Sequence, residues 1–277
     1  MFPQNAGPIG VFDSGYGGLT ILHEIRQLLP QYDYVYLGDN ARAPYGNRSF
    51  EVVYKFTRQA VLKLFERGCH LVILGCNTAS AKALRSIQQR VLPELCPDRR
   101  VLGIIRPTAE NIGALTKSRH IGILATEGTI RSRSYSLEIA KLFPDVKVSG
   151  QACPLWAAIV EANEADSPGA DYFVKKRIDQ LMRQDPQIDA IVLGCTHYPL
   201  LINSIERNTP RGVRVVPQGS YVASSLRDYL ARHPEINSKC TTQGTCRYLT
   251  TESEERFREC ARVFLNEEVN VEHVTLV

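Results

Sequence analysis

Short segments made only of apolar residues alternate with longer amphipathic segments along most of this chain. Strands that are apolar at every position, rather than at every second position, are expected where helices cover both faces of a parallel sheet. The repeated strand–helix order therefore predicts an α/β fold with right-handed crossovers. The predicted strands are residues 8–12, 34–37 and 71–74, and the predicted helices are residues 19–29, 49–67 and 79–91.

The second part of the chain repeats features of the first in the same order. Ile-Gly-Val-Phe at 9–12 is matched by Ile-Gly-Ile-Leu at 121–124, and Glu-Ile-x-x-Leu-Leu-Pro at 24–30 is matched by Glu-Ile-x-x-Leu-Phe-Pro at 138–144. Leu-Gly-Cys ends an apolar segment at both 74–76 and 193–195. Unrelated α/β units can resemble one another locally, but three ordered matches at similar spacing favour an internal duplication. We therefore expect two similar α/β domains with mainly parallel sheets, related by a pseudo-twofold axis, with a cleft between them.

The composition disfavours several classes of protein. Of the 277 residues, 44% are hydrophobic and 22% are charged, as in ordinary globular proteins. The longest apolar runs span about six residues, where a membrane helix needs about 20. The net charge of +4 comes from scattered Lys and Arg residues, without the dense basic stripe that binds nucleic acids. We predict a cytoplasmic protein with no signal peptide, membrane span or nucleic-acid partner.

Eight cysteines are spread over the chain, and no two of them form a Cys-x-x-Cys pair. This spacing argues against a zinc site, so no metal is predicted. The reducing cytosol argues against disulfides. Six of the cysteines are expected to be small buried apolar side chains, namely Cys69, Cys96, Cys153, Cys240, Cys246 and Cys260.

The other two cysteines, Cys76 and Cys195, occupy equivalent positions in the two repeats. Ligands of open α/β sheets bind outside the carboxyl ends of the strands, so halves that face each other would place both thiols in one cleft. Asn77 and Thr78 follow the first cysteine, and Thr196 and His197 follow the second. These pairs offer polar side chains and helix-start amides to a carboxylate, and a helix start also favours a thiolate. His197 can assist proton transfer near neutral pH.

Two opposed thiols suit the inversion of a stereocentre by proton transfer. A proton must leave one face of a carbon while another arrives on the opposite face. A free thiol has a pKa of about 8.5, so one cysteine can act as a thiolate base and the other as a thiol acid. Because an amino-acid α-proton is far less acidic than a thiol, placed donors and exclusion of water must stabilise the carbanionic transition state.

Two further polar segments follow predicted strands. Asp-Ser-Gly-Tyr-Gly-Gly at 13–18 suits an anionic ligand at a helix start, although Asp13 or Ser14 could instead cap the helix. This segment is neither G-x-G-x-x-G nor a Walker sequence, so nucleotide binding lacks support. Residues 41–49 form a loop with Ser49 as the expected N-cap, and a ligand contact and a purely structural turn both remain open there.

Taken in order, these segments resemble those of the glutamate racemases, within the aspartate/glutamate racemase superfamily. The resemblance covers residues 9 to about 202. It is carried by Gly-Val-Phe-Asp-Ser-Gly at 10–15 with Gly-Gly at 17–18, Tyr-Leu-Gly-Asp at 36–39, Ala-Pro-Tyr-Gly-Asn-Arg-Ser at 43–49, Cys-Asn-Thr-Ala-Ser at 76–80, Ile-Gly-Ile-Leu-Ala-Thr at 121–126, Ala-Cys-Pro-Leu at 152–155 with Glu161, and Gly-Cys-Thr-His-Tyr-Pro-Leu at 194–200.

The resemblance implies interconversion of L- and D-glutamate, with Cys76 and Cys195 as the two acid/base residues. It implies that Asp13 supports Cys76, and that His197, with Glu161, supports Cys195. Neither pyridoxal phosphate nor a metal is implied, and members of the family commonly form homodimers that make D-glutamate for peptidoglycan. The residues implied to hold the substrate are Asp13, Ser14, Tyr45, Gly46, Asn77, Thr78, Thr196 and His197.

Two segments depart from the family pattern. Arg106 stands where many relatives carry an acidic or small residue, and Pro-Gln-Gly-Ser at 217–220 replaces a segment that is often acidic. We expect neither segment to touch the catalytic set. The resemblance also implies that the chain returns to the first domain after about residue 208. This gives a first domain of residues 1–100 and 209–277 and a second domain of residues 101–208.

Three other functions are compatible with parts of this pattern. A racemase of aspartate or a related acid would share the fold, and only the resemblance at Tyr45-Gly46 and Asn77-Thr78 favours glutamate. A cysteine hydrolase with Cys195 as nucleophile and His197 as base would leave Cys76 without a purpose. A catalytically silent amino-acid-binding protein would keep the cleft, and only activity measurements separate it from an enzyme.

Overall fold

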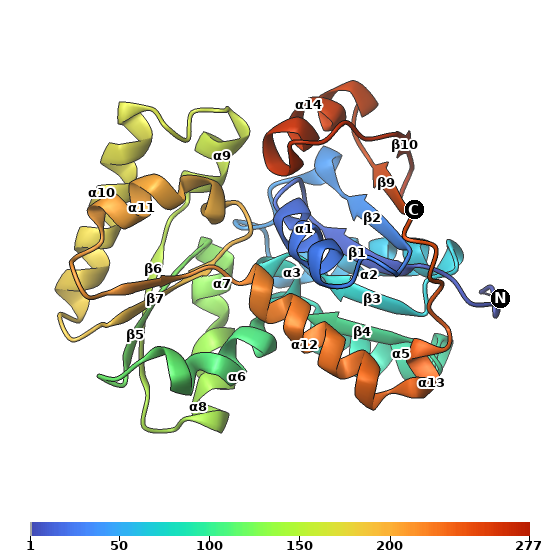
Figure 1. The fold of residues 1–277 in the computed structure, drawn as a ribbon, viewed down its shortest axis with the longest axis horizontal. Coiled ribbons are helices and arrows are strands. Elements are labelled where there is room, and N and C mark those ends of the chain that lie inside the picture. The colour runs from blue at the N-terminus through green and yellow to red at the C-terminus, as the bar shows by residue number, and fades with distance from the viewer. Residues whose placement is uncertain (1) are drawn as a thin grey trace.

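The computed structural model describes residues 2–277, which form two parallel β-sheets covered by helices (Figure 1). The first sheet has the strand order β10-β9-β2-β1-β3-β4, and the second has the order β6-β5-β7-β8. The predicted α/β class is therefore confirmed. The strands are β1 (Ile9–Asp13), β2 (Tyr34–Gly38), β3 (Leu71–Leu74), β4 (Arg100–Gly103), β5 (His120–Ala125), β6 (Lys147–Ala152), β7 (Ala190–Gly194), β8 (Arg214–Val216), β9 (Cys246–Thr250) and β10 (Val271–His273).

The helices occupy most of the remaining chain. Short 3-10 helices span Asn40–Arg42 and Tyr198–Leu201, and a π turn spans Ile87–Val91. The α-helices are α1 (Gly18–Leu28), α2 (Phe50–Glu66), α3 (Asn77–Lys82), α4 (Leu84–Ser86), α5 (Leu92–Leu95), α6 (Ile105–Leu115), α7 (Glu127–Ser132), α8 (Ser134–Leu142), α9 (Trp156–Glu161), α10 (Pro168–Gln184), α11 (Ile202–Asn208), α12 (Gly219–Arg232), α13 (Pro234–Asn237) and α14 (Glu254–Leu265).

The two sheets share one strand order. The run β2-β1-β3-β4 in the first sheet corresponds position by position to β6-β5-β7-β8 in the second. In each sheet the earliest strand of the run lies between the next two, and β3 and β7 take equivalent places beside β1 and β5. The prediction of two similar α/β domains is confirmed, and the two cysteine-bearing loops leave equivalent strands.

The strands are apolar throughout because both faces of each sheet are buried. In β3, Leu71 and Ile73 belong to one hydrophobic core, while Val72 and Leu74 belong to another. Successive side chains of a strand point to opposite faces, so a sheet covered on both sides requires an apolar residue at every position. The first of these cores continues into the second domain, where it includes Leu193 of β7.

One predicted helix differs from the structure. The segment predicted as one helix over residues 79–91 begins earlier, at Asn77, and is divided into α3, α4 and a π turn. It begins earlier because Cys76 is the N-cap, whose sulfur accepts a hydrogen bond from the Ala79 amide at 3.4 Å. Pro93 follows the π turn and cannot donate the amide hydrogen bond that a regular helix needs there.

The chain passes between the sheets twice, after β4 and after β8. β4 pairs with β3 in the first sheet, and β8 pairs with β7 in the second. The predicted boundaries at residues 100 and 208 would divide β4 and separate β8 from its sheet, so both lie too early. We propose boundaries between residues 103 and 105 and near residue 217 instead. Beyond the second crossing, α12 packs on α1 and β9 pairs with β2.

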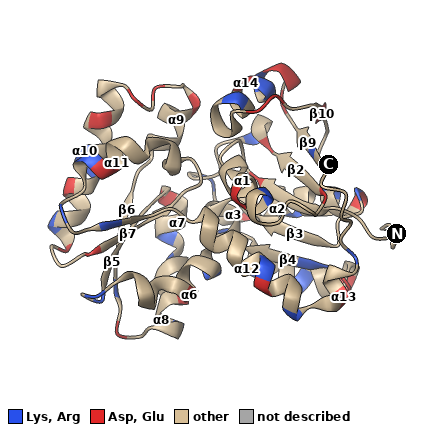
Figure 2. Cartoon of the chain, viewed as in Figure 1, with Lys and Arg blue, Asp and Glu red and all other residues tan. Residues whose placement is uncertain are grey.

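Charged residues of both signs are interspersed on the outer helices, for example on α10, α12 and α14 (Figure 2). Many of them form exposed pairs one helical turn apart, such as Lys175 with Asp179 and Arg258 with Glu254. Pairs of this kind contribute little to stability, because water screens them. Within residues 2–277, no helix combines the length and apolarity required to cross a membrane.

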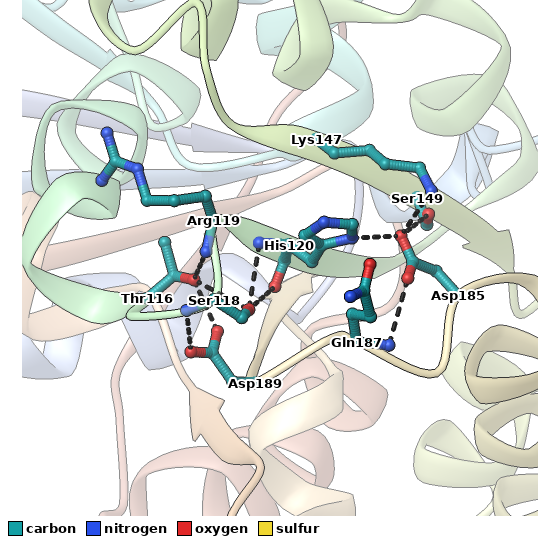
Figure 3. A network of polar contacts seen from close by, with 9 residues as sticks. All are labelled: Thr116, Ser118, Arg119, His120, Lys147, Ser149, Asp185, Gln187 and Asp189. Carbon is teal, nitrogen blue, oxygen red and sulfur yellow. Dashed lines mark hydrogen bonds and ion pairs between the residues drawn. The ribbon is translucent and has the colours of Figure 1, made fainter.

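A polar network closes the end of the second sheet that lies away from the carboxyl ends of its strands (Figure 3). The Asp185 side chain is only 2% exposed and accepts hydrogen bonds from His120 Nδ1 at 2.8 Å and from the Gln187 amide at 3.1 Å. Lys147 Nζ lies 3.0 Å from the same carboxylate. Burial alone would raise the pKa of Asp185, but these donors lower it from 3.8 to about 2. The carboxylate thus joins the starts of β5 and β6 to the loop before β7.

Replacement of Asp185 by asparagine should destabilise the chain in a pH-dependent way. Because the folded-state pKa is below the unfolded value, the carboxylate stabilises the fold above about pH 4, and this contribution is lost as the pH falls towards 2. Asp185→Asn should lower the free energy of unfolding by about 1–3 kcal/mol at pH 7. Urea unfolding at pH 7, 4 and 3 measures this difference, which should shrink at the lowest pH. An equal difference at every pH would contradict the role of the charge.

Candidate active site

A cavity of about 350 Å³ lies where the carboxyl ends of β1, β3 and β7 meet. Both domains line it, and all eleven residues singled out from the sequence contribute to its wall. The roles assigned to them stay predictions at this point, but the structure brings every one of them to the same cavity. They are Asp13, Ser14, Tyr45, Gly46, Cys76, Asn77, Thr78, Glu161, Cys195, Thr196 and His197.

Cys76 lies at the start of α3 on the wall formed by the first domain. Its sulfur accepts the Ala79 amide hydrogen bond of the helix start and lies 3.3 Å from Ser14 Oγ. Burial raises the pKa of the Cys76 thiol to about 12, and the negative charge of Asp13 adds to this shift. The two hydrogen bonds oppose the shift without cancelling it. Cys76 is therefore a protonated thiol at neutral pH in the absence of a ligand.

Asp13 ends β1 and is only 1% exposed. Burial raises the pKa of its carboxyl group from 3.8 to about 7, although the charge of His197 and the backbone amides of Gly18 and Gly15 act in the opposite direction. Within residues 2–277, its Oδ2 atom has no hydrogen-bond partner. A buried oxygen without a partner is costly, and Asp13 is one of the residues that line the cavity.

Cys195 follows β7 and belongs to a different set of polar groups. Its sulfur lies 3.8 Å from His197 Nδ1, and His197 Nε2 lies 2.7 Å from Glu161 Oε1. Burial alone would lower the pKa of His197, but the hydrogen bonds and negative charges of Cys195 and Glu161 raise it to about 10. His197 therefore carries a positive charge at neutral pH and lies within reach of the Cys195 sulfur.

Neighbouring helices fix the position of His197. Phe264 of α14 meets the imidazole edge to face, with ring centroids 5.5 Å apart. On the side of α1, Thr20 Oγ1 donates a hydrogen bond to the Thr196 carbonyl at 2.9 Å. Gly17 lies so close that a Cβ atom there would overlap His197 Nδ1 and Thr196 Oγ1. The glycine at this helix start is thus required for close approach of the two domains.

The loop at residues 41–49 contributes residues 43–47 to the cavity wall. The Tyr45 hydroxyl donates to the Asp39 carboxylate, which also binds Arg42 at 2.7 Å, so this hydroxyl is already paired. Gly46 lies against Thr126, and its carbonyl accepts a hydrogen bond from the Gly128 amide at 2.7 Å. This contact joins the loop of the first domain to α7 of the second.

Several residues of the cavity wall were not predicted from the sequence. Thr126 lies 2.9 Å from Thr78, hydroxyl to hydroxyl, and so extends the row of polar groups beside Cys76. Cys153, expected to be an inert buried thiol, is indeed 1% exposed but also borders the cavity. Glu252 and Arg256 reach it from the C-terminal part of the chain, which the recognised motifs do not include. Among the described residues that line the cavity, Arg256 is the one Lys or Arg.

The two segments that depart from the family pattern lie in different surroundings. Arg106 is exposed on α6 and pairs with Glu110 at 2.8 Å. Gln218, by contrast, is only 2% exposed, and its side-chain oxygen accepts a hydrogen bond from Asn77 at 2.7 Å. Gln218 thus contacts a predicted substrate-binding residue, although no hydrogen bond in the described part of the chain joins it to a predicted catalytic residue. The sequence offered no sign of it, because the two residues are 141 positions apart.

No group of three or more His, Cys, Asp and Glu side chains within residues 2–277 is arranged to hold a metal ion. The site instead consists of two thiols with different partners, Ser14 and Asp13 near one and His197 with Glu161 near the other. Such a site can remove and deliver protons. A hydrolase would need only Cys195 and His197, whose Sγ and Nδ1 atoms lie 3.8 Å apart. Such a mechanism would give the second thiol, Cys76, no role.

The sequence and the structure both match those of known proteins. A family model described as Asp/Glu/Hydantoin racemase matches residues 17–225. The glutamate racemase of Ruegeria sp. (strain TM1040) is 40% identical over 278 residues, which cover 95% of this chain and 98% of that protein. The crystal structure of a glutamate racemase isoform from Bacillus anthracis has a TM-score of 0.89 and 34% identity, and the match covers 98% of each chain. The glutamate racemase from Francisella tularensis, in complex with D-glutamate, gives a TM-score of 0.86 and 31% identity over 98% of each chain.

Substitution of Gly17 by alanine should impair catalysis with little effect on folding. The new methyl group would overlap His197 and Thr196, so these side chains must shift from their positions beside Cys195. A displacement of about 1 Å at a reacting group can cost about 100-fold in rate, and we expect a loss of that size in kcat. Gly169→Ala is the matched control, because its Cβ would meet only Ser167 Oγ, at 3.6 Å. Native-like kinetics in Gly17→Ala would show that this close approach is unimportant.

Asp13→Asn should increase stability relative to the native chain at high pH, even though it impairs catalysis. Since the folded-state pKa of about 7 exceeds the ordinary 3.8, folding takes up a proton between these values, and the native chain loses stability as the pH rises through this range. The amide does not titrate, so the variant should gain on the native chain by up to a few kcal/mol between pH 4 and 8.

Thermal unfolding at pH 5 and pH 8 measures this effect of Asp13→Asn. Asp228→Asn, at an exposed position on α12, should follow the native chain at both values. A difference between Asp13→Asn and the native chain that stays constant or shrinks with rising pH would contradict the raised pKa.

Proposed function

The chain belongs to the Asp/Glu/hydantoin racemase family and is an amino-acid racemase, and we propose that it interconverts L- and D-glutamate by proton transfer at Cys76 and Cys195. The sequence resemblance to the glutamate racemases is confirmed by these matches. One observation supports the proposed mechanism above others. The two thiols leave equivalent strands of the two domains and line the same cavity.

The two thiols differ in their surroundings. The Cys195 sulfur lies 3.8 Å from His197 Nδ1, with which it can exchange a proton, whereas burial and the charge of Asp13 keep Cys76 protonated. For one enantiomer, the Cys195 thiolate removes the α-proton while the Cys76 thiol delivers a proton to the opposite face. The net result is inversion at the α-carbon with one proton moved from carbon to sulfur and one from sulfur to carbon. The other enantiomer requires the reverse assignment, with Cys76 as thiolate.

The polar partners adjust these two states. Glu161 holds His197 in its charged form by accepting from Nε2, so the positive charge remains beside the Cys195 sulfur. Ser14 can donate to a Cys76 thiolate or accept from a Cys76 thiol, since either atom of this 3.3 Å contact can be the donor. The Asp13 pKa of about 7 allows its carboxyl group to lose or take up a proton near neutral pH. It can therefore receive the substrate ammonium group or support the formation of a Cys76 thiolate.

The α-carbanion must be stabilised by donors that are in place before reaction. Asn77 and Thr78 form the first turn of α3, where free backbone amides and the helix dipole attract a carboxylate. Thr196 lies opposite, beside Cys195. Donors held in a cavity from which water is excluded stabilise developing charge more strongly than water does. We propose that these side chains bind the α-carboxylate, and that neither pyridoxal phosphate nor a metal takes part.

Glutamate is proposed as the substrate because the similar relatives and solved structures described above are glutamate racemases. The likeness to them extends over nearly the whole chain, including Tyr45 and Gly46, which line the cavity. We further propose a cytoplasmic enzyme that provides D-glutamate for peptidoglycan. A homodimer, expected from the family, stays a prediction.

Removal of either thiol tests the mechanism. Cys76→Ala and Cys195→Ala should each lower kcat for both glutamate enantiomers by about 1,000-fold or more, because each direction needs both an acid and a base. Circular dichroism at a wavelength where the enantiomers differ follows the reaction. Cys96→Ala serves as the control, because this thiol is 2% exposed and lies outside the cavity. Near-native turnover in either cavity variant would exclude the two-thiol mechanism. A native chain that does not racemise glutamate would exclude the proposed substrate.

A further inference from the structure

Three buried side chains, Asn77, Tyr135 and Gln218, form a closed ring of hydrogen bonds behind the cavity wall. The Gln218 amide donates to the Tyr135 hydroxyl at 2.5 Å, Tyr135 donates to Asn77 Oδ1 at 2.7 Å, and Asn77 Nδ2 donates to Gln218 Oε1 at 2.7 Å. All three residues are no more than 3% exposed. Only Asn77 also borders the cavity.

A backbone carbonyl determines the direction of every hydrogen bond in this ring. Gln218 Nε2 lies 3.2 Å from the Ile104 carbonyl oxygen, which can only accept, and 3.0 Å from Thr108 Oγ1. The NH2 end of the Gln218 amide must therefore face Ile104, and its oxygen must face Asn77. Asn77 can then meet Gln218 only with its own NH2 end. Its oxygen is left to accept from Tyr135, whose hydroxyl in turn accepts from Gln218.

The ring leaves one hydrogen atom of Asn77 unused. The Asn77 amide has two N–H groups, and Gln218 accepts one of them. The second belongs to a side chain on the cavity wall, at the first residue of α3. If the amide were reversed, its oxygen would take that place and would repel a carboxylate. The orientation of this amide thus decides whether position 77 attracts or repels an anionic ligand.

We propose that Tyr135 and Gln218 are positioning residues that hold the Asn77 amide with an N–H directed at a carboxylate of the substrate. This inference rests on the proposed function, because it assumes a substrate carboxylate at Asn77. Neither residue touches the cavity. Both act through Asn77. The Ile104 carbonyl, at the first crossing between the domains, fixes the orientation of the Gln218 amide and thereby that of the Asn77 amide. Gln218 itself lies at the second crossing, so Asn77 is tied to both connections.

Tyr135→Phe is the most direct test, because it removes one hydroxyl and little else. The Asn77 oxygen then loses its donor, and the amide can reverse. We expect KM for both glutamate enantiomers to rise by about tenfold or more, with a smaller fall in kcat, because a hydrogen bond to a charged group is stronger than one between neutral groups. A purely structural role for Tyr135 would lower the melting temperature and leave KM unchanged.

Tyr34→Phe is the matched control. Tyr34 is 2% exposed, and its hydroxyl donates to the Leu29 carbonyl at 2.7 Å, so the substitution removes the same group from an equally buried site far from Asn77. This variant should lose a similar amount of thermal stability while its KM stays within about twofold of the native value. A KM in Tyr135→Phe no higher than in Tyr34→Phe would overturn the inference.

Gln218→Met provides a second route if Tyr135→Phe folds poorly. Methionine has nearly the same length as glutamine but no polar amide, so it removes both the acceptor for Asn77 and the donor to Tyr135. The same rise in KM is expected, and an unchanged KM in a folded Gln218→Met chain would overturn the inference. Activity of the native enzyme distinguishes failure of this inference from failure of the proposed function. If it racemises glutamate while both variants keep its KM, only the ring is misassigned, whereas a native chain without glutamate racemisation refutes the proposed function and this inference with it.

Discussion

The carboxyl ends of parallel strands meet at one edge of a sheet, and in this chain two such edges face each other across a single cavity. Because β3 and β7 hold equivalent places in two sheets of the same strand order, the residues that follow them reach this cavity from opposite domains. Cys76 and Cys195 thus lie in one site although they are 119 positions apart along the chain. The repeated architecture provides two thiols in equivalent positions. The polar side chains around each thiol differ, and they distinguish one from the other.

That difference is electrostatic. The Cys195 sulfur faces an imidazole whose positive charge is maintained by Glu161, while the Cys76 sulfur lies near a carboxyl group whose burial raises its pKa to about 7. In a low-dielectric cavity these neighbours act more strongly than they would in water. In the proposed mechanism, these different neighbours allow one sulfur to accept a proton while the other donates one. The close approach of α1 at Gly17 and the packing of Phe264 keep the charged imidazole in place.

Sequence reasoning reached the parts of this structure that depend on local pattern. Fully apolar strands predicted parallel sheets, and the repeated Leu-Gly-Cys located both thiols. Both features depend only on residues that are neighbours in the sequence. It could not reach contacts that depend on tertiary placement. Gln218 meets Asn77 from 141 positions away, and Arg256 enters the cavity on a helix outside the recognised motifs. The crossings between the domains likewise depend on the pairing of β4 with β3 and of β8 with β7, which the sequence does not show.

The central claim is that two separate groups exchange protons with opposite faces of one carbon, and hydrogen isotope transfer in heavy water tests it most directly. L-Glutamate and D-glutamate are supplied in turn, and the α-position of substrate and product is followed by proton NMR during the first few per cent of reaction. The account predicts that the product carries deuterium from the outset while the remaining substrate keeps its original hydrogen, in both directions. A product that retains the original hydrogen, or substrate that gains deuterium as fast as product forms, would show a single base and contradict the account.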